Sequence, residues 1–175
     1  MRKQILTYGV ISGAIVSGLV FASFPFWNSG VINFDNGELV GYTTMVLALS
    51  VVFFGIKSCR DTLFDGSITF WKAFRIGLLI SLIASCMYAI AWEISYHTFA
   101  SGFMERMTEY NLQKIRSGGP SEEELQRAVE EMEQFSALYK NVFFRFGITI
   151  AEILPVGIVI TLISSLLLRR EPRES

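Results

Sequence analysis

Four polar side chains near the ends of two apolar stretches are the residues of this chain best placed to do chemistry. Glu93 and His97 are four residues apart, so a helix would place them on one face. Arg145 and Glu152 are seven residues apart, which is two helical turns, and would also share a face. Two carboxylates held close together tend to share one proton. The pattern therefore allows a protonatable site built from two helices.

The cost of burying charge makes these residues functional candidates. An ionisable group at the centre of a membrane helix costs about 2.5–3.5 kcal/mol on insertion scales. We place Glu93 and Glu152 in the outer thirds of antiparallel spans, at similar depth, so that with His97 and Arg145 they form one polar cluster below the outer surface. Transporter sites usually lie nearer the midplane.

Three interpretations of this cluster stay open at the level of sequence. In the first, Arg145 neutralises one glutamate and clamps two helices together. In the second, Glu93 and His97 extend into the outer headgroups. In the third, Glu93 and Glu152 form a site for a substrate or a proton.

The elements that position these residues are four long apolar stretches. A helix needs about 20 apolar residues to cross about 30 Å of hydrocarbon. Of the 175 residues, 51% are hydrophobic and 18% are charged, a balance that favours a membrane protein. We predict one all-α membrane domain, 1–175, a four-helix bundle with spans at about 5–27, 39–56, 76–97 and 142–168. The first span is longer than the core of a signal peptide, so we expect it to be retained.

The distribution of charge predicts the orientation. Basic residues flank the spans on one side: Arg2, Lys3, Lys57, Arg60, Lys72, Arg75, Arg169, Arg170 and Arg173. The segment between the first two spans contains Asp35 and Glu38 and neither Lys nor Arg. The positive-inside rule then predicts a multi-pass protein of the bacterial inner (cytoplasmic) membrane with both termini in the cytoplasm.

The polar segment between the last two spans, about 98–141, is predicted to be an antiparallel helical hairpin that extends the third and fourth spans outward. Apolar residues recur at helical spacing on both sides of a turn containing Gly118, Gly119 and Pro120. Ser121 and Glu124 have the spacing of a capping box. Eight glutamates and five basic residues between positions 95 and 141 make this segment acidic. Its apolar stripes either pack only against each other, or the hairpin recognises a partner or a second copy, with a preference for a basic surface or a cation.

Two further segments carry packing or docking signals. Gly9, Gly13 and Ser17 form a small-residue ridge on the first span, which suits packing within the bundle or a dimer contact. The inner loop, 57–75, contains the turn signal Asp65-Gly66. It is predicted to form a short interfacial helix, either an anchor or a docking site for a cytoplasmic partner or an anionic lipid. Its candidate residues are Arg60, Phe70, Trp71, Lys72, Phe74 and Arg75.

Several of these features together resemble a known family. They are Gly9 and Gly13, then Gly41-Tyr42 followed by Met45, and an inner loop with Arg60-Asp61, Gly66, Phe70, Ala73, Phe74 and Gly77. The chain resembles the bacterial domain-of-unknown-function family 4199 over nearly its whole length. The resemblance implies a bacterial four-span membrane protein and brings no catalytic residues.

Motifs for catalysis are not found in the sequence. It has no phosphate-binding glycine loop, no metal-ligand spacing and no basic-aromatic patch for nucleic acid. We therefore expect no enzyme, no cofactor, no metal and no nucleic-acid partner. The leading hypothesis is a non-enzymatic interaction or structural module in the lipid bilayer, with a membrane or periplasmic protein partner or a second copy. The alternative is a small transporter or proton-linked carrier that uses Glu93 and Glu152.

Overall fold

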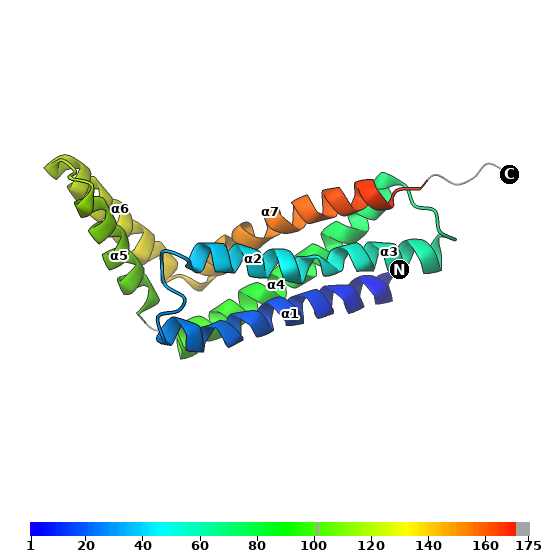
Figure 1. The fold of residues 1–175 in the computed structure, drawn as a ribbon, viewed down its shortest axis with the longest axis horizontal. Coiled ribbons are helices and arrows are strands. Elements are labelled where there is room, and N and C mark those ends of the chain that lie inside the picture. The colour runs from blue at the N-terminus through cyan, green and yellow to red at the C-terminus, as the bar shows by residue number, and fades with distance from the viewer. Residues whose placement is uncertain (101, 171–175) are drawn as a thin grey trace.

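The computed structural model describes residues 1–100 and 102–170, and these fold entirely as helices and short connections (Figure 1). The helices are α1 (Arg2–Asn28), α2 (Gly37–Leu49), α3 (Val51–Leu63), α4 (Phe70–Thr98), α5 (Phe103–Ser117), α6 (Glu122–Tyr139) and α7 (Val142–Leu168). Four stretches are long and apolar enough to cross a membrane, with α2 and α3 together making the second. The predicted all-helical fold with four spans is confirmed. Arg173 lies outside the described residues.

Helix α4 is the centre of the bundle and packs along α1 and along α7. Small side chains allow the close approach. A Cβ atom on Gly77 would lie 2.6 Å from the Thr161 methyl carbon of α7, and one on Gly157 would lie 2.8 Å from Ser81 Cβ. The hydroxyl groups of Ser81 and Thr161 are 3.3 Å apart and hydrogen-bond across the interface. Small residues and buried hydroxyls thus hold α4 against α7, as in other membrane helices.

The small-residue ridge of α1 lies against α4 inside the bundle. A Cβ atom on Gly9 would be 2.8 Å from Ile83 Cβ, and one on Gly13 would be 2.8 Å from Met87 Cβ. Ser17 donates a hydrogen bond of 3.3 Å to the Met87 carbonyl oxygen. Of the two uses expected for this ridge, its position matches packing within the bundle.

The inner loop differs from the prediction. Helix α3 continues to Leu63 and α4 already begins at Phe70, so the connection is only the six residues 64–69. Arg60 therefore lies on α3, beside Asp61. The short interfacial helix predicted to lead into the third span is the first turn and a half of α4 itself, with Phe70, Trp71, Lys72, Phe74 and Arg75. The prediction ended the second span at residue 56 because polar residues begin at Lys57, but the helix continues through them to Leu63. The predicted turn at Asp65 and Gly66 is present, with φ of 48° and 78° at these two residues.

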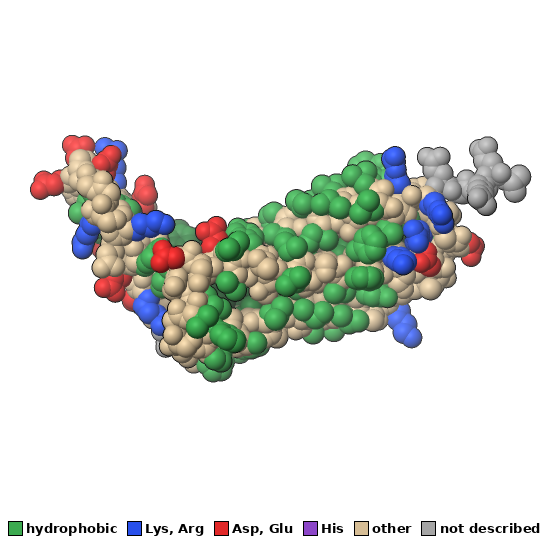
Figure 2. All heavy atoms as spheres, in the orientation of Figure 1, with side chains coloured by type: hydrophobic (Ala, Val, Ile, Leu, Met, Phe, Trp, Pro, Cys, Tyr) green, Lys and Arg blue, Asp and Glu red, His purple; other side chains and the backbone are tan. Residues whose placement is uncertain are grey.

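The two ends of the bundle differ in charge. The N-terminus and the end of α7 lie at the end opposite α5 and α6 (Figure 1). Hydrophobic side chains cover the middle of the visible face, Lys and Arg gather at the terminal end, and Asp and Glu are frequent on the hairpin (Figure 2). At the terminal end, Ile68 of the inner loop pairs with Arg170 through two backbone hydrogen bonds of 2.9 Å.

The outer hairpin forms, but it is not a straight continuation of α4 and α7. Helix α4 ends at Thr98, and α5 starts after Gly102, whose φ of 82° is left-handed and favours glycine. As a result α5 and α6 are inclined to the bundle (Figure 1). The predicted capping box is present: Ser121 N–H donates to Glu124 Oε2 at 2.9 Å, and Glu124 N–H donates to Ser121 Oγ at 3.2 Å.

Replacing Gly13 by leucine should destabilise the bundle, because the new side chain would enter the space held by Met87. Overpacking of this kind costs about 1–3 kcal/mol, so we expect a lower melting temperature for the purified protein in detergent. Gly18→Leu is the matched control, since a Cβ atom there meets nothing within 4 Å. Equal melting temperatures for the two variants would contradict this packing.

The capping box should make the start of α6 sensitive to acid. The backbone and hydroxyl hydrogen bonds from Ser121 hold the pKa of Glu124 below its usual value. A lowered pKa means that the stabilisation is complete above the ordinary glutamate pKa and is lost as pH falls through the lowered value. Hydrogen exchange of α6, corrected for intrinsic rates, should therefore rise at low pH in the wild type. Glu124→Gln should lose this pH dependence and Glu122→Gln should keep it.

Candidate functional site

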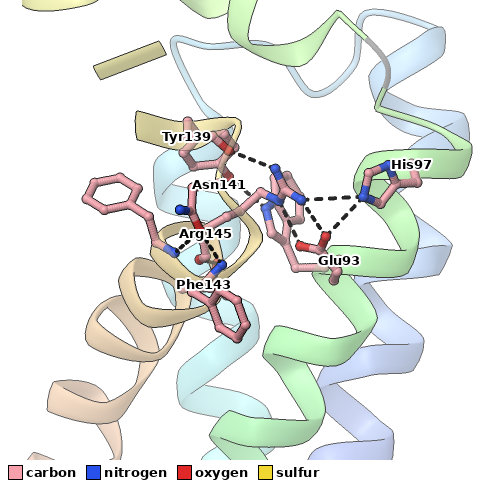
Figure 3. Close-up of polar contacts among 9 residues, drawn as sticks. Glu93, His97, Tyr139, Asn141, Phe143 and Arg145 are labelled. Carbon is pink, nitrogen blue, oxygen red and sulfur yellow. Dashed lines mark hydrogen bonds and ion pairs between the residues drawn. The ribbon is translucent and has the colours of Figure 1, made fainter. Parts of the chain in front are cut away.

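The candidate site lies where α4 ends and α7 begins, at the base of the hairpin (Figure 3). Glu93 and His97 are on the last turns of α4. Asn141 caps α7, because its Oδ1 accepts hydrogen bonds from the N–H groups of Phe143 and Phe144 at 2.9 and 3.4 Å. This cap fixes where α7 starts and so places Arg145 at the level of Glu93.

Arg145 is fully engaged by its surroundings. Its Nε donates a hydrogen bond of 2.7 Å to Glu93 Oε2, and its Nη2 donates to the other carboxylate oxygen. Its Nη1 donates to the carbonyl oxygen of Tyr139 at 2.7 Å, and its guanidinium carbon lies 4.1 Å from the centre of the Tyr96 ring. The residue is only 2% exposed. Such two-pronged pairing with a carboxylate is the strongest geometry available to arginine.

His97 is at the rim of this ion pair. Its Nε2 lies 3.0 Å from Glu93 Oε1 and 3.4 Å from Arg145 Nη2 (Figure 3). The His97 side chain is 66% exposed, whereas that of Arg145 is 3% exposed. The structure thus brings Glu93, His97 and Arg145 together, and their arrangement is that of the clamp interpretation. A carboxylate with both oxygens bound to one guanidinium is poorly suited to exchanging protons.

The last residue of α6 is joined to the same cluster. Trp92 Nε1 donates a hydrogen bond of 2.8 Å to the Tyr139 hydroxyl. Burial raises the pKa of Tyr139 to about 12, so its phenol stays neutral near pH 7. Arg145 therefore ties three helices together: α4 through Glu93, α6 through the Tyr139 carbonyl, and its own α7. The sequence did not indicate that Trp92 and Tyr139 join this cluster, because the two residues are 47 positions apart.

The other arm of the hairpin is attached to the bundle independently. Tyr110 of α5 donates a hydrogen bond to the Asp35 carboxylate in the α1–α2 connection, and this bond raises the pKa of Tyr110. The Tyr110 ring also stacks on Phe34, with ring centres 5.3 Å apart. No sequence signal pointed to this pair, because the two residues are 75 positions apart.

Glu152 does not join the cluster, and the prediction that it faces Glu93 at similar depth is wrong. Arg145 occupies the place opposite Glu93, and Glu152 lies seven residues further along α7, about 10 Å deeper. Among the described residues, Glu152 makes no hydrogen bond or ion pair with Glu93, His97 or Arg145. Glu152 instead lines a separate cavity, together with Glu38 of α2.

The described part of the chain contains neither a cluster of potential metal ligands nor a disulfide. No group of three His, Cys, Asp or Glu side chains there is arranged to hold a metal ion. Cys59 and Cys86 are both free thiols. The chemistry that the cluster supports is electrostatic and structural.

Comparisons with known proteins give a family. A family model described as "Protein of unknown function (DUF4199)" matches residues 7–170, nearly the whole chain. The chain belongs to this family. The resemblance expected from the sequence is therefore confirmed. A search of curated proteins and a search of solved structures found no match. Membership in DUF4199 and the four long apolar helices together indicate a membrane protein of unknown function.

Replacing Arg145 by methionine should strongly destabilise the protein, because Glu93 would keep a partly buried charge without its partner. Breaking a buried ion pair from one side costs about 3–5 kcal/mol. We expect Arg145→Met to lower the melting temperature in detergent much more than Arg127→Met does. Arg127 is a suitable control because it pairs with Glu123 at 3.6 Å on the exposed surface of α6.

A double-mutant cycle separates the ion pair from the rest of the cluster. Removing both charges with Glu93→Gln and Arg145→Met should cost less than the sum of the single changes. Additive effects would mean that Arg145 acts through Tyr139 and Tyr96 rather than through Glu93.

Proposed function

We propose that this membrane protein of unknown-function family DUF4199 is a non-enzymatic interaction module. In this proposal its outer hairpin, α5 and α6, presents an acidic groove to a protein partner that carries a basic surface. The observation that carries the proposal is the attachment of both hairpin arms to the bundle. Tyr110 binds Asp35 on one arm, and the carbonyl of Tyr139 binds Arg145 on the other.

Two separate attachments favour a hairpin held at a fixed angle. An element that only filled space would not need a buried arginine at its base, since a charge in an apolar span is costly. A fixed arm loses less conformational freedom on binding than a mobile one, which favours recognition.

The groove between α5 and α6 has the chemistry of a docking site. It encloses about 540 Å³ and combines the apolar side chains Leu112 and Met132 with three carboxylates, Glu105, Glu109 and Glu133. Two basic residues, Arg116 and Lys140, also line it, so the described lining is acidic by one charge. Charge complementarity then favours a basic segment with an apolar side chain for the groove.

Orientation forms part of the proposal. Among the described residues, Lys and Arg gather at the end of the bundle that holds the N-terminus and the end of α7 (Figures 1 and 2). Positive-inside placement would put that end in the cytoplasm of a bacterial cell and the hairpin on the outer side of the inner membrane. The partner is then a periplasmic or membrane protein.

The carrier alternative has less support. It uses Glu93 and Glu152 as a pair, but both oxygens of Glu93 accept hydrogen bonds from Arg145, and Glu152 lies about 10 Å deeper.

The proposal is tested by placing a photo-crosslinking amino acid at Leu112 in the full chain, expressed in bacterial cells. We expect a light-dependent adduct with one defined protein. The same amino acid at Leu167, a 70% exposed residue near the inner end of α7, should not give this adduct.

Charge reversal decides whether the adduct reflects recognition. Reversing the three groove carboxylates, Glu105, Glu109 and Glu133, to lysine should abolish it. The matched control reverses Glu122, Glu130 and Glu131, which lie on α6 but do not line the groove, and should preserve it. An adduct that survives the charge reversal in the groove would contradict recognition of a basic partner. A crosslinked species of twice the chain's own mass would show that the groove binds a second copy of the chain and not another protein.

A further inference from the structure

A large cavity lies in the outer half of the bundle, beneath the base of the hairpin. It encloses about 790 Å³, within the range of sites for drug-sized molecules. Its walls come from α1, the α1–α2 connection, α2, α4, α7 and the hairpin, and are mostly apolar. This cavity is separate from the hairpin groove.

The cavity exists because the second span packs differently in its two halves. Helix α3 contacts α1, α4 and α7, and closes the inner half of the bundle. Helix α2 contacts α1 and α7 instead, which leaves space in front of α4. The change occurs at Ser50, whose hydroxyl donates to the Leu47 carbonyl oxygen at 2.6 Å, while Phe53 N–H donates to the Ser50 carbonyl oxygen at 3.1 Å. Such a tightened turn with a back-bonded serine often bends a helix.

Glu152 is the deep polar group of this cavity. It lies three residues, about 4.5 Å, from the midpoint of α7, and it is an exposed residue that lines the cavity. Among the described residues its carboxylate has no hydrogen bond and no ion pair. The other carboxylate of the lining, Glu38, is a like charge and not a counter-ion. A group this costly to insert is a marker of a binding or transport path in membrane helices.

The remaining lining suits a cation. Aromatic rings from several elements border the cavity, among them Trp27, Phe34, Tyr88 and Phe103. Ring faces attract ammonium groups, most strongly where water is excluded. Arg106 is the basic residue of the described lining, and it belongs to the hairpin helix α5. The cavity therefore combines the Glu152 carboxylate and the Tyr88 ring on its deep side with Trp27, Phe34 and Phe103 toward the outer end.

We propose that this cavity binds an organic cation with an apolar body, its positive group held by the Glu152 carboxylate and its body packed against the aromatic rings. The apolar body fills the space between α2 and α4, and Glu38 adds negative potential on the outer side. This site goes beyond the proposed interaction of the hairpin and does not depend on it.

The test uses the full chain in nanodiscs made of phosphatidylglycerol and follows the fluorescence of Trp27 and Trp92, which line the cavity. Tetraphenylphosphonium is the probe, and tetraphenylborate is its control of similar shape and opposite charge. We expect saturable binding of the cation and not of the anion. Equal binding of both ions, or no saturable binding, would overturn the proposal.

Single substitutions identify which carboxylate binds the positive group of the probe. Glu152→Gln should weaken tetraphenylphosphonium binding by about tenfold or more. Glu38→Gln should weaken it less, and Glu133→Gln on the hairpin groove should leave it unchanged. The melting temperature of Glu152→Gln checks folding, and removal of a membrane charge should not lower it. A folded Glu152→Gln variant with wild-type affinity would overturn the assignment.

Nanodiscs of a second lipid composition distinguish two sources of the cation, a membrane lipid and a free amine. Competition by added phosphatidylethanolamine would identify an aminolipid as the occupant. Unchanged tetraphenylphosphonium affinity would identify a free, membrane-dissolved amine.

Discussion

The burial of Arg145 is the constraint on which the outer half of this protein depends. An arginine residue that is 2% exposed at the edge of an apolar span needs a partner for its charge and for its N–H groups. Glu93 supplies the charge, and the carbonyl of Tyr139 takes a further N–H. Because these groups come from α4, from α7 and from the end of α6, one side chain fixes the depth at which the two spans meet and the point at which the hairpin leaves them.

The sequence predicted those features that depend on one segment at a time. Four apolar stretches predicted the four long apolar helices. The spacing of Ser121 and Glu124 predicted the capping box that the structure contains. The resemblance to the family, which rested on scattered glycine and aromatic residues, is also confirmed. Each of these signals is local, because hydrophobicity and caps act within a few turns of the chain.

Features that depend on the relative depth of two helices were not predictable in this way. Glu93 and Glu152 each lie on a plausible helical face, but a face says nothing about height along the neighbouring helix. The small residues at Gly77 and Gly157 set how closely α4 and α7 approach, and the Asn141 cap sets where α7 begins. Together they place Arg145, and not Glu152, opposite Glu93. The pairing of Tyr110 with Asp35 was missed because these residues are 75 positions apart and Asp35 lies in a connection between helices.

Helix α5 stands between the two candidate binding regions. One of its faces contributes Glu109 and Leu112 to the hairpin groove, and another contributes Phe103 and Met107 to the cavity below. A single helix that forms part of both walls gives the two regions a physical route for thermodynamic linkage. If an occupant of the cavity shifts the resting position of α5, it changes the affinity of the groove by some factor, and a groove partner must then change the affinity of the cavity by that same factor.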